Sequence, residues 1–171
     1  MRKVLLFSIS FLIMLLVTGC KKTDTKQDNT VFVSILPQKY FVEKIAGDRL
    51  KVEVLVTPGK SPETYEPTPQ QVISLGNAKA LFTIGVPFEN AFLPKIQATI
   101  KSLKIVDTSF GIKKRILEKE TKAPHIWLSP SLVKIQAENI YNALIEIDPD
   151  GKSNYTKGYQ CILDELLNGY Q

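Results

Sequence analysis

Four short apolar runs alternate with segments of helical periodicity through the first two thirds of the chain, and this alternation restricts the fold more than any other feature. The runs lie at 31–35, 52–56, 80–84 and 105–106. Apolar spacing and helix start and stop residues predict helices between them, at 38–46, 70–75 and 89–101. Strands joined through helices by short connections favour an α/β fold, in which a parallel sheet is flanked by helices on both faces.

Two further helices are predicted in the last third of the chain. Ser129 and Pro130 are typical of the N-cap and the first turn of a helix. Apolar residues follow them at steps of three and four, until Asp148 and Pro149 end the helix. The last helix is predicted from a single apolar face, which holds Tyr155, Tyr159, Ile162, Leu166 and Tyr170.

The N-terminal residues have the pattern of a bacterial export signal. A short positive end (MRK) precedes residues 4–17, which are nearly all apolar. This run is too short for a membrane span of about 20 residues but suits a signal peptide. The segment VTGC, which ends at Cys20, resembles a bacterial lipobox. The resemblance implies a signal peptide at 1–19, cleavage before Cys20 and attachment of a diacylglyceryl group to the Cys20 sulfur.

Residues 20–30 are predicted to be a flexible tether that carries the lipid, because no apolar side chain occurs between 21 and 30. The folded part would then lie outside the cytoplasm, lipid-anchored to the bacterial membrane in the periplasm or at the cell surface. The alternatives are an uncleaved N-terminal anchor and an ordinary signal peptide with an incidental cysteine.

Charge and rare residues exclude several classes of function. The chain has 22 Lys+Arg against 17 Asp+Glu, but the excess is small and scattered, which argues against nucleic-acid binding. One His excludes a site built from several histidines of this chain, and two Cys cannot form a disulfide scaffold. With Cys20 lipidated, Cys161 is expected to be a small buried side chain on a helix. An intermolecular disulfide and a metal ligand are the alternatives for Cys161.

Two loops carry candidate ligands. In open α/β sheets, ligands bind in loops beyond the carboxyl ends of the strands. The loop after the second run contains Glu63 and Glu66, and a later loop contains His125, the only imidazole of the chain. Glu66 is expected to cap the short helix that follows it, with a role as a ligand as the alternative. The lysine-rich stretch at 113–122 is predicted to be a solvated surface loop.

Both loops resemble motifs of one family, the solute-binding lipoproteins of zinc and manganese ABC importers. Residues 58–69 (PGKSPETYEPTP) are similar to the first metal-ligand loop of that family, which usually has the pattern P-G-x-x-P-H-x-Y-E-P-T-P. Residues 123–130 (APHIWLSP) are similar to the second, usually D-P-H-x-W-x-x-P. The resemblance extends over 31–171.

The resemblance implies two α/β lobes joined by one long helix, with a metal ion held between the lobes by four side chains, two from each. Glu63 and His125 would be the ligands that this sequence supplies. The N-terminal lobe would be 31–150, and 151–171 would begin the linking helix. The second lobe is absent from this sequence, so that a fragment or a truncated product is expected.

The same resemblance implies an extracytoplasmic receptor, not an enzyme, that captures zinc, manganese or iron and delivers the ion to an ABC permease and its ATPase. Two positions depart from the family pattern. Glu63 replaces a His, which favours harder ions such as manganese or iron(II) more than an imidazole does. Ala123 replaces an Asp, which removes a group that could orient His125.

Two other classes of function are alternatives to the metal-binding receptor. A metal-dependent hydrolase would need an open coordination position and a general base beside the metal. No further motif in the sequence supplies them. A surface interaction protein or adhesin, with weak or lost metal binding, is the alternative that a truncated chain makes more credible. Measured metal affinity would separate the receptor from the adhesin.

Overall fold

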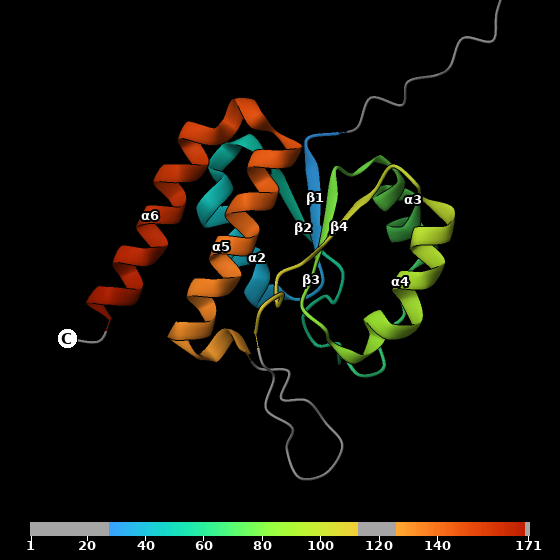
Figure 1. Cartoon of the computed structure of the whole chain (residues 1–171). Helices are drawn as coiled ribbons and strands as arrows, with labels where there is room; N and C mark the ends of the chain where they lie inside the picture. The colour runs from blue at the N-terminus through green and yellow to red at the C-terminus, as the bar shows by residue number, and fades with distance from the viewer. Residues whose placement is uncertain (1–27, 113–125, 170–171) are drawn as a thin grey trace, which may run out of the picture.

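A parallel sheet forms the centre of the molecule, as the alternating pattern predicts. The computed structural model describes residues 28–112 and 126–169 (Figure 1). The strands are β1 (Thr30–Val33), β2 (Lys51–Val54), β3 (Ala80–Thr83) and β4 (Lys104–Asp107). They are hydrogen-bonded in the order β2-β1-β3-β4, and each of these pairings is parallel. Each predicted run therefore corresponds to one strand.

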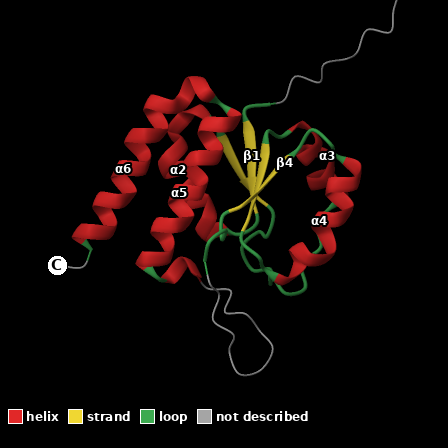
Figure 2. Cartoon of the chain, viewed as in Figure 1, coloured by secondary structure: helices red, strands yellow, loops and turns green. Residues whose placement is uncertain are grey.

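Helices lie on both sides of this sheet, which confirms the predicted fold class (Figure 2). They are α2 (Leu36–Ala46), α3 (Pro69–Asn77), α4 (Pro87–Thr99), α5 (Pro130–Ile147) and α6 (Lys152–Asn168), with short 3₁₀ turns η2 (Gly47–Arg49), η3 (Ile126–Leu128) and η4 (Pro149–Gly151). In Figure 1, α2, α5 and α6 lie on one side of the sheet, and α3 and α4 lie on the other. Within the described ranges, none of the helices combines the length and the apolar character that crossing a membrane requires.

The strand side chains alternate between two hydrophobic cores. Val31 and Val33 of β1 and Phe82 of β3 belong to the core that includes residues of α2, α5 and α6. Phe32 and Leu81 belong to the second core, which includes residues of α3 and α4. These strand residues are at most 4% exposed. A strand turns successive side chains to opposite faces, so a continuous apolar run is what a sheet covered on both faces requires.

Proline in the first turn sets the start of several helices. It occupies this position in α2, α3, α4 and α5, where its fixed φ suits a helix and its missing N–H costs nothing. As a result, α2 begins at Leu36, before the predicted position. Ser129 is the N-cap residue of α5, as predicted, but its side chain makes no cap hydrogen bond. Its Oγ lies 3.2 Å from the Oγ of Ser131 instead.

The prediction that Cys161 is buried is wrong. Helix α6 packs through Tyr155 and Ile162, which are both buried, as the periodicity predicts. Cys161 immediately precedes Ile162 and is exposed, because successive residues of a helix are rotated by about 100°. Its Sγ lies 3.9 Å from Oε1 of Glu165.

A polar cluster fixes the start of α6 against η2. The Arg49 guanidinium donates to Asp148 through Nε at 2.9 Å and through a terminal nitrogen at 3.1 Å. The hydroxyl of Tyr155, whose side chain is fully buried, donates to the same carboxylate. Burial alone would raise the pKa of Asp148, but the hydrogen bonds from Tyr155 and Arg49 outweigh it and lower that pKa. Burial, and then the bond to Asp148, raise the pKa of Tyr155 to about 12.

We expect this cluster to make the chain sensitive to alkali through Tyr155. The pKa of an unfolded tyrosine is about 10, whereas the folded structure raises the pKa of Tyr155 to about 12. The stabilisation is therefore fully present below the lower value and is lost as pH rises through the higher one. Urea denaturation of wild type and Tyr155→Phe at neutral pH and in this alkaline range should show the steeper loss in wild type. Equal losses in the two proteins would mean that Tyr155 titrates at its ordinary pKa.

Candidate functional site

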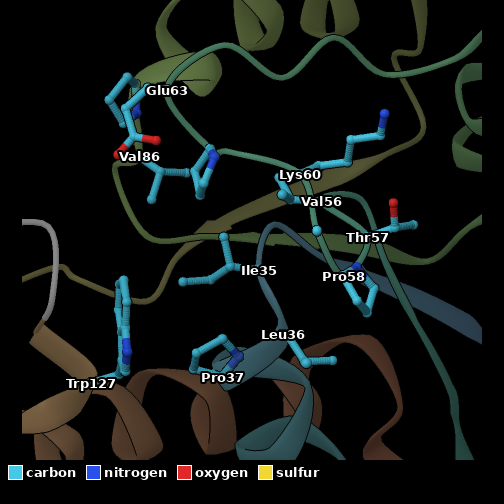
Figure 3. Close-up of a pocket in the computed structure, with 13 residues that line it drawn as sticks. Ile35, Leu36, Pro37, Val56, Thr57, Pro58, Lys60, Glu63, Val86 and Trp127 are labelled. Carbon is cyan, nitrogen blue, oxygen red and sulfur yellow. The ribbon is translucent and has the colours of Figure 1, made fainter.

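A pocket lies where the strand order of the sheet reverses. The chain leaves β1 toward β2 on one side, and β3 lies on the other side of β1. Loops beyond the carboxyl ends of strands at such a point form a crevice that binds ligands in open α/β sheets. The cavity here has a volume of about 220 Å³, and Figure 3 shows its walls. It is lined by Ile35, Leu36, Pro37, Val56, Thr57, Pro58, Gly59, Lys60, Pro62, Glu63, Val86, Pro87 and Trp127.

Glu63 lines this pocket from the loop between β2 and α3. The loop turns twice, through a hydrogen bond from Lys60 N to Thr57 O at 3.1 Å and one from Thr64 N to Ser61 O at 3.3 Å. The Ser61 hydroxyl donates to the Glu63 carboxylate. Glu63 is exposed, and Figure 3 shows the side chain of Lys60 extending away from it. The loop therefore presents a carboxylate at the mouth of the pocket.

Residues on both sides of Glu63 are tied to the start of α4. The backbone N–H of Phe88 donates to the carbonyl of Pro62 at 3.1 Å. The ring of Tyr65 packs edge-on against the ring of Phe88, with their centroids 5.4 Å apart. The Tyr65 hydroxyl also donates to Oε1 of Gln71 at 2.7 Å, and Gln71 Nε2 donates to the carbonyl of Leu55 at 2.9 Å. These contacts hold the loop on the sheet.

The prediction that Glu66 caps α3 is wrong. The N-cap residue is Thr68, whose Oγ1 accepts a hydrogen bond from the N–H of Gln71 at 3.3 Å. The Gln71 side chain accepts in return from the N–H of Thr68 at 2.9 Å, which completes a capping box. Glu66 is exposed and lies two residues before the N-cap. A capping oxygen has to come from the residue next to the helix, and Thr68 holds that place.

The described chain resumes beside the same pocket, one residue after His125. Ile126 is 4% exposed, and its carbonyl accepts a hydrogen bond from Nε2 of Gln136 in α5 at 3.2 Å. Trp127 lines the pocket, and Figure 3 shows it at the lower left of the view, below Glu63. His125 itself, with Ala123, the stretch 113–122 and Cys20, lies outside the described residues.

A buried polar network holds the strand ends beneath the pocket. Oε1 of Gln38 accepts from the N–H of Ser34 at 3.1 Å and from that of Ile35 at 3.3 Å. Its Nε2 donates at 3.0 Å to Oγ1 of Thr108, and that hydroxyl donates to the carbonyl of Thr83 at 2.7 Å. The network joins the ends of β1, β3 and β4, and satisfied networks of this kind rigidify a core.

Sequence reasoning missed a second carboxylate near the pocket. Glu89, in the first turn of α4, is only 3% exposed, and its carboxylate accepts hydrogen bonds from two backbone N–H groups. Burial raises its pKa above the ordinary value. An acid in the first turn of a helix that begins with Pro87 is the signal that could have singled it out.

The described residues alone do not complete a metal site. Between 28 and 112 and between 126 and 169, no group of three or more His, Cys, Asp and Glu side chains could hold an ion. Glu63 is the carboxylate that lines the pocket. A transition-metal ion usually takes four or more ligands, so an ion at the pocket would need donors beyond those described.

Comparisons with known proteins agree on one family. The model of the family Zinc-uptake complex component A periplasmic matches residues 31–168. A putative metal-binding protein of Chlamydia muridarum is 36% identical over 144 residues, which are 80% of this chain and 49% of that protein. The manganese ABC transporter substrate-binding lipoprotein of Streptococcus gordonii is 32% identical over 134 residues, 72% of this chain and 43% of that protein.

Solved structures show the same similarity. A crystal structure of ZnuA has a TM-score of 0.76 and 45% sequence identity, and the match covers 81% of this chain and 55% of that chain. The Mn-bound periplasmic metal binding protein from Candidatus Liberibacter asiaticus has a TM-score of 0.74 and 25% identity, over 82% of this chain and 54% of that chain. The chain spans about half the length of the curated relatives it matches. With its fold and most of its length matched in this way, the chain belongs to the zinc-uptake complex component A periplasmic family.

Proposed function

We propose that this chain is the N-terminal lobe of an extracytoplasmic receptor that captures a first-row divalent metal ion and delivers it to an ABC permease and its ATPase. The observation that carries the proposal is the meeting of two segments at one pocket. Glu63, from the loop that resembles the first ligand motif, and Trp127, from the second, both line it. Relatives in sequence are named as substrate-binding lipoproteins of metal ABC transporters.

Glu63 and His125 are the proposed ligands from this lobe. Glu63 is exposed on a loop held by Phe88, and His125 directly precedes the buried Ile126. A carboxylate and an imidazole are both good ligands for first-row transition metals. The other ligands would come from a second lobe, joined through a linking helix that begins at 151–171. We propose 31–150 as the lobe itself.

The proposed cargo is zinc, manganese or iron(II), with Glu63 shifting preference toward the harder ions. An anionic oxygen replaces the neutral nitrogen that the family usually has at this position, and oxygen ligands suit manganese better than imidazole does. Among the relatives, one is named for manganese and another for iron. Nothing in the described residues or in these names favours the adhesin alternative, and we do not propose it.

Substitutions of the two proposed ligands test this function. We expect wild type to bind Zn²⁺ and Mn²⁺ with micromolar or weaker affinity, and His125→Ala to weaken binding most. Glu63→Gln removes the charge and should cost less but still weaken binding clearly. Glu63→His should move preference toward zinc over manganese. Calorimetric titration of both ions measures all four proteins.

The exposed Glu66 supplies the matched control, because it lies in the same loop but does not line the pocket that contains Glu63 and Trp127. Glu66→Gln removes the same charge and should bind nearly as wild type does. Should Glu63→Gln bind like wild type, Glu63 is a bystander and the proposed ligand set is wrong. Binding should also weaken as pH falls, because protons compete with the metal ion for its ligands.

A further inference from the structure

Glu89 is a buried carboxylate that the metal-binding proposal does not use. Its Oε1 accepts from the N–H of Ile84 at 3.1 Å, and its Oε2 accepts from the N–H of Gly85 at 2.7 Å. Gly85 has φ of 82°, a left-handed conformation that favours glycine. The carboxylate therefore holds the turn through which the chain leaves β3 and enters α4.

The residues that follow this turn reach the pocket and the Glu63 loop. Val86 and Pro87 line the pocket beside Glu63. Phe88 then contacts that loop twice, through its N–H to the carbonyl of Pro62 and through its ring to that of Tyr65. Pro62 and Tyr65 lie on either side of Glu63 in the sequence, so Phe88 fixes the short segment that carries the proposed ligand.

We propose that Glu89 is a positioning residue for Glu63, which it orients through the β3–α4 turn and Phe88. The inference rests on the proposed function, because Glu63 is the ligand that would be positioned. Glu89 itself does not qualify as the ligand, because it is 3% exposed and each of its oxygens accepts a backbone N–H. Groups that orient metal ligands in this way typically contribute 10–100-fold to metal affinity.

The pKa of Glu89 lies above its ordinary value, and burial is the largest cause. Burial raises its pKa, while the Ser34 side chain and the N–H groups of Ile84 and Gly85 lower it and Asp107 raises it. The Ser34 hydroxyl lowers the pKa of Glu89 because it lies close to the carboxylate. It forms no hydrogen bond of good geometry with any group in the described part of the chain. The two backbone N–H groups are therefore the directional contacts of the carboxylate.

The test is metal binding by Glu89→Gln, followed through the fluorescence of Trp127. Trp127 is the single tryptophan of the chain and lines the pocket, so its emission reports on that site. Glutamine keeps the size of the side chain but replaces one acceptor oxygen with an NH₂ group, which leaves one of the two N–H groups without a partner. We expect affinity for Mn²⁺ and Zn²⁺ to fall roughly tenfold or more.

Two control variants separate positioning from other effects. Glu66→Gln removes an exposed carboxylate from the Glu63 loop, and should bind nearly as wild type does because Glu66 takes no part in the contacts described. Ile140→Val shortens a fully buried side chain of the opposite core. It should lower the melting temperature and leave affinity unchanged. If Glu66→Gln weakens binding as much as Glu89→Gln, the effect is one of net charge and the proposal is overturned.

A readout without metal keeps the inference separate from the proposed function. In Glu89→Gln, amide hydrogen exchange should accelerate at Phe88 and at 61–65, and should not do so in Ile140→Val. Wild type that binds neither ion would overturn the metal-binding function. Wild type that binds, together with a Glu89→Gln variant of unchanged affinity and unchanged exchange, would overturn the positioning role alone. Should Glu89→Gln fail to fold, Glu89→Asp, which keeps the charge one methylene shorter, is expected to show the same changes to a smaller degree.

Discussion

Replacing Cys20 with serine is expected to abolish attachment of the diacylglyceryl group to the protein. The resemblance to a lipobox predicts a diacylglyceryl group on the Cys20 sulfur. Two acyl chains are enough for stable membrane anchoring, whereas a single chain binds only marginally. In the ranges that the structure describes, no helix offers an alternative means of spanning the bilayer. Serine has no sulfur to acylate, so the variant should be recovered unprocessed or released from the cell envelope.

The measurement is partition into a detergent phase, combined with the intact mass of the recovered protein. Cys161→Ser is the matched control, because Cys161 is exposed on α6. It should partition as wild type does. If Cys20→Ser changes neither the mass nor the partition, the chain is not lipidated at this residue and the anchor prediction fails.

Replacing Gly158 with alanine is expected to separate α6 from α2. A Cβ at this position would lie 2.5 Å from the carbonyl oxygen of Lys44, 2.6 Å from that of Ile45 and 2.7 Å from the Ile45 Cα. All three atoms belong to the backbone, so no side chain can rotate away. Overpacking of this kind costs about 1–3 kcal/mol or more, against at most about 1 kcal/mol gained from helix propensity. We expect a net loss of about 2 kcal/mol in the free energy of unfolding.

Gly76 in α3 provides a control of opposite sign. A Cβ there would meet nothing within 4 Å. Gly76→Ala should therefore be neutral or stabilise the chain by up to about 1 kcal/mol, through helix propensity alone. Urea denaturation of both variants measures the difference. A Gly158→Ala variant as stable as Gly76→Ala would show that α6 can shift on α2 at little cost.

Much of the fold could be predicted because the sheet is covered on both faces. Its inner strands, β1 and β3, are then mostly apolar, and such runs stand out between helices of different period. Residue type was a poorer guide on α6. The spacing of apolar residues predicts the buried face that contains Tyr155 and Ile162. The wrong prediction for Cys161 rests instead on the general tendency of cysteine to be buried. The position of a residue around the helix axis decides its exposure, and Cys161 lies outside the buried face of α6.

Only the residues of the site that lie in local sequence motifs could be predicted. The loop of Glu63 stands out because it follows a strand, and the resemblance to the family's first ligand motif selects Glu63 within it; Glu63 lines the pocket. Glu89 was missed because the partners of a buried acid are backbone groups that only the folded chain brings together. Glu66 was assigned as a cap from its charge, although a cap depends on adjacency to the helix, which Thr68 has.

The close crossing at Gly158 has a mechanical consequence for the pocket. Helix α2 begins at the pocket wall, where Leu36 and Pro37 line the cavity, and its last turn meets Gly158. Backbone touches backbone at that crossing, so no compressible side chain separates the two helices. A load applied to the C-terminal end of α6 would reach the pocket wall through α2 without being absorbed at the crossing. Beyond Gly158 the link to α2 continues, because the Glu165 carboxylate accepts hydrogen bonds from Lys44 at 2.6 Å and from Tyr40 at 3.0 Å.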